Sequence, residues 1–249
     1  MRVLESRRYV FRPLSGLYFG LLFVLLLIVW PLLSVFYREL LVVELGLPPW
    51  AFGGVLFLSL VGSYINVPVT TVEAEVPIYT YREVRFFFVT WRVPQVEMGV
   101  RRTVITLNVG GAVVPMLISA YLVLFSIPAC SVDVVSSYVK LLVVMAVVAV
   151  TTHRSSRIVK GLGIATPMLG PPATTALVTL LIDLVSPMSC PTQIAYVGGT
   201  IGALIGADLM NLGKLPEVGA PMASIGGAGT FDGIYLTGIM SVLLVLLLM

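Results

Sequence analysis

Charged residues are scarce in this sequence. They make up only 11% of its 249 residues, whereas hydrophobic residues make up 58%. Soluble globular domains carry a charged share of about 25%. The shortage of charge therefore excludes an ordinary soluble protein, and the mean hydropathy of +1.04 indicates a membrane protein.

Apolar stretches near the length that a membrane-crossing helix needs recur seven times along the chain. The first stretch is too long for a cleaved signal peptide, and no small-residue cleavage site follows it, so we expect a retained helix. We therefore predict an all-α membrane protein, a bundle of seven transmembrane helices, with residues 1–249 forming a single membrane domain. The expected spans are 16–36, 49–66, 104–126, 138–152, 166–186, 193–212 and 229–249.

One sizeable polar insertion, residues 67–103, separates the second and third expected helices. It is rich in Val, Thr, Tyr and Phe, and the alternation in VEAEV, residues 72–76, is typical of a strand. We predict a small β-hairpin in the cytoplasm. Two interpretations stay open: a lid or docking surface for a partner, or a rigid connector that lies on the membrane surface.

The distribution of Lys and Arg predicts the orientation. With the N-terminus in the cytoplasm, 13 of the 15 basic residues fall on the cytoplasmic side, and only Arg38 and Lys140 fall outside. We expect a protein of the cell membrane with a cytoplasmic N-terminus and an extracytoplasmic C-terminus. The net charge of +3 then reflects contact with lipid headgroups, so the expected partner is the lipid bilayer and not nucleic acid.

Histidine and cysteine are nearly absent. His153 is the single histidine, and no cysteine lies on the same predicted side of the membrane, so no metal site is expected. The sequence has no P-loop, no dinucleotide-binding fingerprint and no HExxH motif, so no cofactor is expected. Cys130 and Cys190 both fall in predicted outside loops, where they are either a disulfide or two unpaired cysteines.

Two carboxylates, Asp208 and Asp232, lie inside predicted spans, where an unpaired charge is unfavourable by several kcal/mol. Each falls within about one turn of the cytoplasmic end of its helix. Consecutive helices are usually neighbours, so we predict a carboxylate dyad in a pocket that is open to cytoplasmic water. The expected lining lies beside the acids and at the start of the fifth span: Gly206, Asn211, Gly229, Gly170, Pro171 and Pro172.

The two acids support three hypotheses for function. Carboxyl groups held close together share a proton, so one acid can activate a water while the other protonates a carbonyl oxygen. The first hypothesis is an intramembrane di-aspartyl hydrolase that cleaves a transmembrane peptide. The second is a proton- or cation-coupled carrier of a small solute that uses the same acids. The third is a non-catalytic structural or partner-binding membrane protein. The sequence leaves the substrate, the ion and the oligomeric state open.

Three stretches carry a resemblance to a known family: GSYINVP, GLGIATPMLGPP and GGTIGALIGADLMNLGKLPEVGAPMASIGGAGTFDGIYLTGI. They resemble the prokaryotic membrane-protein family called domain of unknown function 1614, which implies a multi-pass membrane protein and no particular activity. A second likeness is to intramembrane aspartyl proteases of the presenilin and prepilin-peptidase type. It implies catalytic roles for Asp208 and Asp232, although Phe231 stands where those proteases have glycine.

Overall fold

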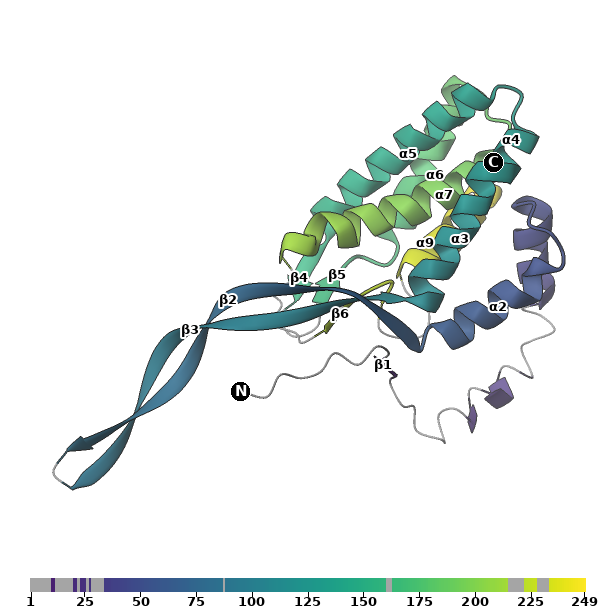
Figure 1. Ribbon diagram of the computed structural model, residues 1–249. Coiled ribbons are helices and arrows are strands. Elements are labelled where there is room, and N and C mark those ends of the chain that lie inside the picture. The colour runs from purple at the N-terminus through teal and green to yellow at the C-terminus, as the bar shows by residue number, and fades with distance from the viewer. Residues whose placement is uncertain are drawn as a thin grey trace.

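The fold is a bundle of apolar helices with a long two-stranded β-ribbon at one end (Figure 1). The structure is a computed structural model, and it describes residues 10–11, 20–21, 23–25, 27, 34–86, 88–159, 163–214, 222–227 and 233–249. Most of the expected first span, 16–36, lies outside these residues.

The long helices run along the bundle between the end that carries the ribbon and the opposite end (Figure 1). They are η1 (Glu39–Glu44), α2 (Ala51–Gly62), η2 (Val109–Val113), α3 (Val114–Tyr121), η3 (Leu122–Ser126), α4 (Ile127–Cys130), α5 (Val134–Ser155), α6 (Gly170–Val185), α7 (Pro191–Ala203), η4 (Leu204–Asp208), η5 (Leu209–Lys214) and α9 (Gly233–Leu248). The segments from η2 to α4 form one continuous helix, and so do those from α7 to η5.

Local signals in the sequence explain where several helices begin. Asp133 caps α5, because its Oδ1 accepts hydrogen bonds from the backbone N–H groups of Val135 and Ser136 at 3.0 and 3.2 Å. Pro191 is the first residue of α7, a position where proline's missing N–H removes no intrahelical bond.

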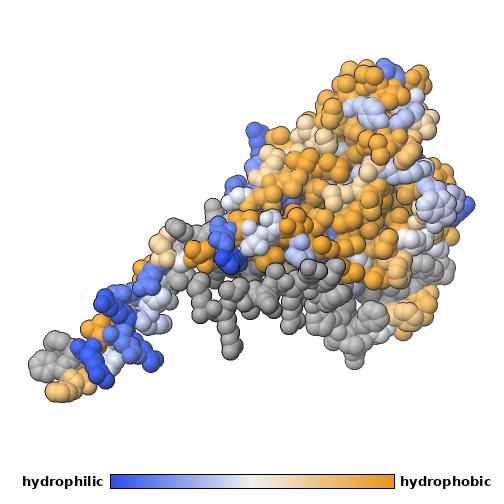
Figure 2. Space-filling view, viewed as in Figure 1, coloured by the Kyte–Doolittle hydropathy of each residue, from blue (hydrophilic) through white to orange (hydrophobic). Residues whose placement is uncertain are grey.

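Three of the described helices are long and apolar enough to cross a membrane: Val109–Cys130, Val134–Ser155 and Pro191–Lys214. Three other apolar helices are shorter: Ala51–Gly62, Gly170–Val185 and Gly233–Leu248. Figure 2 shows hydrophobic side chains covering the visible face of the bundle, with hydrophilic ones gathered along the ribbon. The chain is therefore a membrane protein, but the predicted all-α bundle of seven membrane-spanning helices is wrong.

Several expected spans are longer than the helices because they include apolar strand and turn residues. The first five residues of the expected span 104–126 belong to a strand that ends at Asn108. The expected span 49–66 stops being helical at Gly62, and 166–186 becomes helical only at Gly170. Valine, isoleucine and threonine raise the hydropathy of a strand as much as that of a helix, so hydropathy alone could not separate the two.

The β structure is more extensive than the small hairpin that the sequence suggested. Strands β2 (Ile65–Phe86) and β3 (Val89–Asn108) pair in antiparallel register, from Asn66 opposite Asn108 to Phe86 opposite Val89. The ribbon twists visibly along its length (Figure 1). At its base, β1 (Val10–Phe11) and β6 (Met222–Ile225) complete the order β1-β2-β3-β6, with β6 parallel to β3. A separate small sheet pairs β4 (Arg157–Val159) with β5 (Gly163–Ala165).

A buried polar junction joins the ribbon to the bundle. The Asn108 side chain donates to the Ser63 carbonyl oxygen at 2.8 Å and to Asn66 Oδ1 at 3.2 Å. Its Oδ1 accepts from the backbone N–H of Gly111 at 2.8 Å, and Ser224 donates to Asn66 Oδ1 at 2.6 Å. Because buried amide groups need these partners, the junction fixes the position of the ribbon relative to the first long helix.

Helix α7 lies at the centre of the bundle and is the most buried of the described helices, with Tyr196 fully enclosed. Glycines of α7 and of η4, which continues it, let α5 approach closely. A methyl group on Gly202 would lie 2.8 Å from Val148 Cβ, and one on Gly206 would collide with the Ala149 carbonyl oxygen. Small residues at four-residue spacing are a usual contact between membrane helices.

Candidate functional site

A cavity of about 300 Å³ lies at the end of the bundle that carries the sheets, which we call the sheet end. Four helices of the bundle contribute to it, together with strand β5 and the turn that follows this strand. The lining residues are Thr152, Ile164, Ala165, Thr166, Pro167, Met168, Pro171, Ala203, Ala207, Asp208, Gly233, Ile234 and Thr237.

Asp208 contributes a half-buried carboxylate to this cavity, and it ends the π-helical segment η4. A π-helical turn breaks the regular hydrogen-bond pattern of an α-helix and is frequent at functional sites. The side chain of Asn211 donates to the carbonyl oxygens of Gly206 and Ala207 at 3.2 and 2.9 Å, so it satisfies carbonyl groups in the irregular turn. The local sequence thereby holds Asp208 at the cavity without leaving the neighbouring backbone unsatisfied.

The Gly- and Pro-rich loop forms the second wall. Strand β5 leads from the small sheet into a turn that ends at α6, where the Gly170 N–H donates to the Pro167 carbonyl oxygen at 3.2 Å. The hydroxyls of Ser156 and Thr166 lie 3.0 Å apart and tie the loop to the end of α5. Irregular backbone near a membrane helix is tolerated where it faces a polar cavity, and this loop lines one.

Hydroxyl groups supply the remaining polar lining. Thr237 donates to the Gly233 carbonyl oxygen on its own helix. Thr152 is 1% exposed, and within the described residues its Oγ1 makes no hydrogen bond. An unsatisfied buried hydroxyl that borders a cavity marks a position for a bound water or ligand.

The structure places some of the predicted site residues at the cavity and others beside it. Asp208 and Pro171 line the cavity. Gly206 packs against α5, and Asn211 caps the irregular turn; neither is a lining residue. Gly170 and Pro172 begin α6 beside the cavity without lining it.

Two predicted site residues, Asp232 and Gly229, lie outside the described residues, so the structure does not test the dyad. Gly233, the residue after Asp232, does line the cavity. The sequence reasoning missed Thr152 and Thr237. Gly233 and Thr237 lie one turn apart on a single helix face, but this spacing alone does not mark a site.

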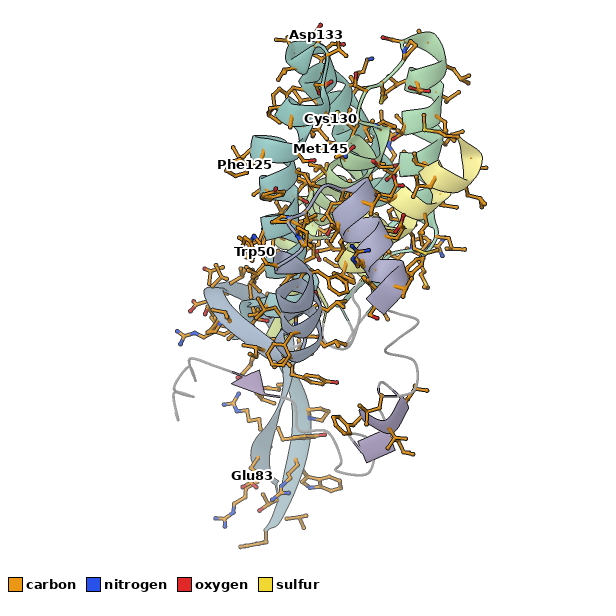
Figure 3. All side chains as sticks on the ribbon, turned by 90° about the vertical axis from the view of Figure 1, so that its right-hand side faces the viewer. Trp50, Glu83, Phe125, Cys130, Asp133 and Met145 are labelled. Atoms are coloured by element: carbon orange, nitrogen blue, oxygen red, sulfur yellow. A yellow bond between two sulfur atoms is a disulfide. The ribbon has the colours of Figure 1, made fainter. Side chains whose placement is uncertain are left out.

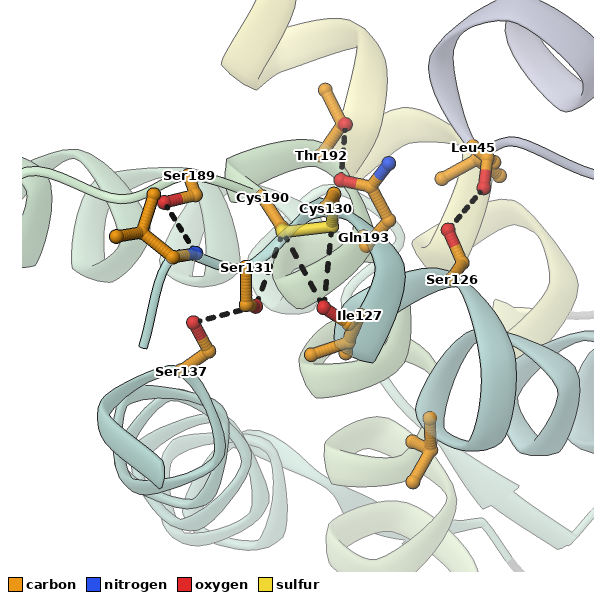
Figure 4. Close-up of a disulfide and its surroundings, with 12 residues drawn as sticks. Leu45, Ser126, Ile127, Cys130, Ser131, Ser137, Ser189, Cys190, Thr192 and Gln193 are labelled. Carbon is orange, nitrogen blue, oxygen red and sulfur yellow. Dashed lines mark hydrogen bonds between the residues drawn. A yellow bond between two sulfur atoms is a disulfide. The ribbon is translucent and has the colours of Figure 1, made fainter. Parts of the chain in front are cut away.

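The other end of the bundle, the disulfide end, is closed by a disulfide between Cys130 and Cys190, whose Cα atoms are 6.0 Å apart. Figure 4 shows it between α4 and the start of α7, where Ser131 Oγ lies 3.4 Å from Cys190 Sγ. Gln193 donates to the Glu44 carbonyl oxygen at 2.8 Å, which fixes η1 to α7 at the same end. Figure 3 shows Asp133 and Cys130 at one extreme of the molecule and Glu83 of the ribbon at the other.

Within the described residues, no three His, Cys, Asp or Glu side chains are grouped as they would be in a metal site. The polar groups that line the cavity are carboxylate and hydroxyl oxygens, which can bind water and exchange protons.

These features define a membrane protein whose helix bundle holds a polar cavity at one end and a disulfide at the other. The chain belongs to the family described as "Protein of unknown function (DUF1614)", whose model matches residues 60–244. This match confirms the family predicted from the sequence. No curated protein and no solved structure matches the chain. The likeness to presenilin-type proteases accordingly has no support from these comparisons.

Proposed function

We propose that the protein is an intramembrane hydrolase that cleaves a peptide bond with Asp208 and Asp232. One observation carries the proposal: Asp208 and Gly233, the neighbour of Asp232 in the sequence, line the same cavity. In the proposed reaction one carboxylate takes a proton from a water molecule, which attacks the scissile carbonyl carbon. The other carboxyl group donates its proton to the carbonyl oxygen, which gives a tetrahedral diol. The first acid then passes the proton that it took from water to the amide nitrogen, the C–N bond breaks and the amine leaves, and the diol returns a proton to the second carboxylate.

Strand β5 favours a peptide as the substrate. Its residues Ile164 and Ala165 line the cavity, and among the described residues β5 pairs only with β4. An edge strand can bind an extended peptide through backbone hydrogen bonds. A peptide added to β5 would place its backbone beside the cavity that contains Asp208.

We further propose that the protein lies in the cell membrane with the sheet end in the cytoplasm. Arg154 and Lys214 lie in the last turns of helices at this end, and Arg157 follows α5. The positive-inside rule expects such basic residues on the cytoplasmic side. The disulfide at the opposite end fits an oxidising, extracytoplasmic compartment.

The proposed activity is tested with purified protein in detergent micelles and a set of model transmembrane peptides, with products identified by mass spectrometry. Asp208→Asn and Asp232→Asn should each lower the cleavage rate by at least about 100-fold, the usual contribution of general acid–base catalysis. The double variant should be no slower than either single one, because the two acids act as a unit.

Asp183→Asn is the matched control. Asp183 lies on α6 away from the cavity, and its Oδ1 accepts from the Met188 N–H at 2.7 Å. This variant should cleave at the wild-type rate. Cleavage that survives Asp208→Asn, or a wild-type protein that cleaves none of the peptides, would refute the hydrolase.

A further inference from the structure

A second polar feature runs through the interior of the bundle, beyond the cavity. Three facing helices, α6, α7 and α9, carry hydroxyl side chains about one turn apart, all buried in the bundle. We call them the hydroxyl column: Thr175, Thr179, Tyr196, Thr200, Thr237 and Ser241.

The helices bring these hydroxyls together because glycines face them. A methyl group on Gly199 of α7 would lie 2.7 Å from Ser241 Oγ and 3.1 Å from Thr175 Oγ1. One on Gly238 of α9 would collide with Thr200 Oγ1. Each glycine therefore marks a place where hydroxyls of neighbouring helices meet across the bundle.

Some of these hydroxyls have a hydrogen-bond partner among the described residues and others do not. Ser241 donates to the Thr237 carbonyl oxygen, and Thr175 donates to the Pro171 carbonyl oxygen, as is common in membrane helices. By contrast, within the described residues the hydroxyls of Thr179, Tyr196 and Thr200 make no hydrogen bond, although each residue is 0% exposed. Buried polar groups of this kind usually bind ordered water.

The hydroxyl column is continuous with the cavity. Thr237 belongs to both, and Asp208 lies two turns beyond Thr200 along the same continuous helix. At the other end, Thr192 donates to Gln193 Oε1 at 3.0 Å, and both side chains are buried at the start of α7. From Thr192 to Asp208 the helix rises about 24 Å, which is most of the hydrocarbon thickness of about 30 Å.

We propose that the hydroxyl column is a proton path, in which hydroxyls and the waters they bind connect Asp208 to the disulfide end. In each step an oxygen accepts a proton from one neighbour and passes its own proton to the next, so no group is oxidised and none changes its net charge. Protons fit the column better than a metal cation does. The six side chains of the column include no carboxylate, whereas sites for divalent cations such as Ca²⁺ usually include carboxylate ligands. The path does not depend on peptide cleavage.

The test uses the full chain reconstituted in liposomes of phosphatidylcholine and phosphatidylglycerol that contain a pH-sensitive dye. A potassium gradient with valinomycin drives proton entry. Liposomes that contain the wild-type protein should acidify faster than empty ones. Thr200→Val should slow the proton flux by about tenfold, because the hydroxyl column then lacks one hydrogen-bonding group. Thr151→Val is the matched control, since Thr151 is exposed on α5 and donates to the Val147 carbonyl oxygen at 2.8 Å.

Three results would overturn the proton path: wild-type flux no faster than in empty liposomes, equal flux in Thr200→Val and wild type, or a flux that needs sodium in the medium. Thermal unfolding provides a second readout. If the Thr200 hydroxyl binds water, replacing it by valine should lower the stability of the protein. If the hydroxyl is dry and unsatisfied, the same replacement should raise the stability. Greater stability of Thr200→Val would therefore also contradict the proposal.

Discussion

At the scale of single residues, the close packing of the helices depends on where glycines permit two helix backbones to approach. Gly206 precedes Asp208 by two positions and faces α5, so one short segment of the central helix combines a tight helix contact with the carboxylate of the cavity. Asn211 then satisfies the carbonyl oxygen of the same glycine. The position of Asp208 is therefore set by its neighbours as much as by its own interactions.

Replacing Gly206 by alanine should destabilise the protein by about 1–3 kcal/mol, because the added methyl group meets the Ala149 backbone, which cannot move without separating α5 from α7. Thermal unfolding in detergent measures the change. Gly213→Ala is the control, since nothing lies within 4 Å of a methyl group placed there. Equal melting temperatures for Gly206→Ala and Gly213→Ala would show that the close contact between α5 and α7 has been misassigned.

At the scale of elements, the sequence predicted strand structure where polar and apolar residues alternate, as in residues 72–76. It did not predict that β3 continues through Thr103–Asn108, because that stretch is apolar enough to resemble the start of a helix. Its strand conformation depends on partners distant in sequence: β2 on one side and β6, more than 110 residues later, on the other. Long-range pairing of this kind has no local signal.

The candidate site, like the strands, was predicted only in part from the sequence. An acid inside an apolar stretch indicated Asp208, and clustered glycine and proline indicated the loop that ends at Pro171. The hydroxyls of Thr152 and Thr237 were not predicted, because threonine is common on every face of a membrane helix. Only the packing of four helices around one cavity distinguishes them.

The disulfide connects two elements at the end of the bundle opposite the cavity. It closes a loop with a sequence separation of 60 residues, and removing it should lower the free energy of unfolding by roughly 4 kcal/mol. Chemical unfolding of the Cys130→Ala, Cys190→Ala double variant measures this loss. Reductant should destabilise the wild type and leave the double variant unchanged; equal stability of the two proteins would show that the disulfide contributes nothing.

At the scale of the whole molecule, the two ends differ in chemistry. The sheet end carries the ribbon and the cavity, and the disulfide end carries the linked loops (Figures 1 and 3). Exposed ion pairs along the ribbon, Arg102 with Glu73 and Arg92 with Glu83, suit a ribbon in water and not in lipid. The proposed membrane orientation follows from this difference between the ends.

Topology reporters test that orientation. A reporter inserted at Phe88, in the turn between β2 and β3, should report the cytoplasm, and one fused after Met249 should report the opposite side. The chain end after α9 lies far from the ribbon tip, across the bundle (Figure 1). Reporters that give the same side would contradict the proposed arrangement in the membrane.

The central claim is that Asp208 shares a proton with Asp232 at the cavity, and infrared spectroscopy measures it most directly. At neutral pH the wild-type protein should show one carbonyl band from a protonated carboxyl group, because two adjacent carboxylates retain one proton between them. Asp208→Asn and Asp232→Asn should each remove or shift this band, whereas Asp183→Asn should leave it unchanged. A spectrum without such a band, or one in which only one of the two cavity variants alters it, would contradict the account.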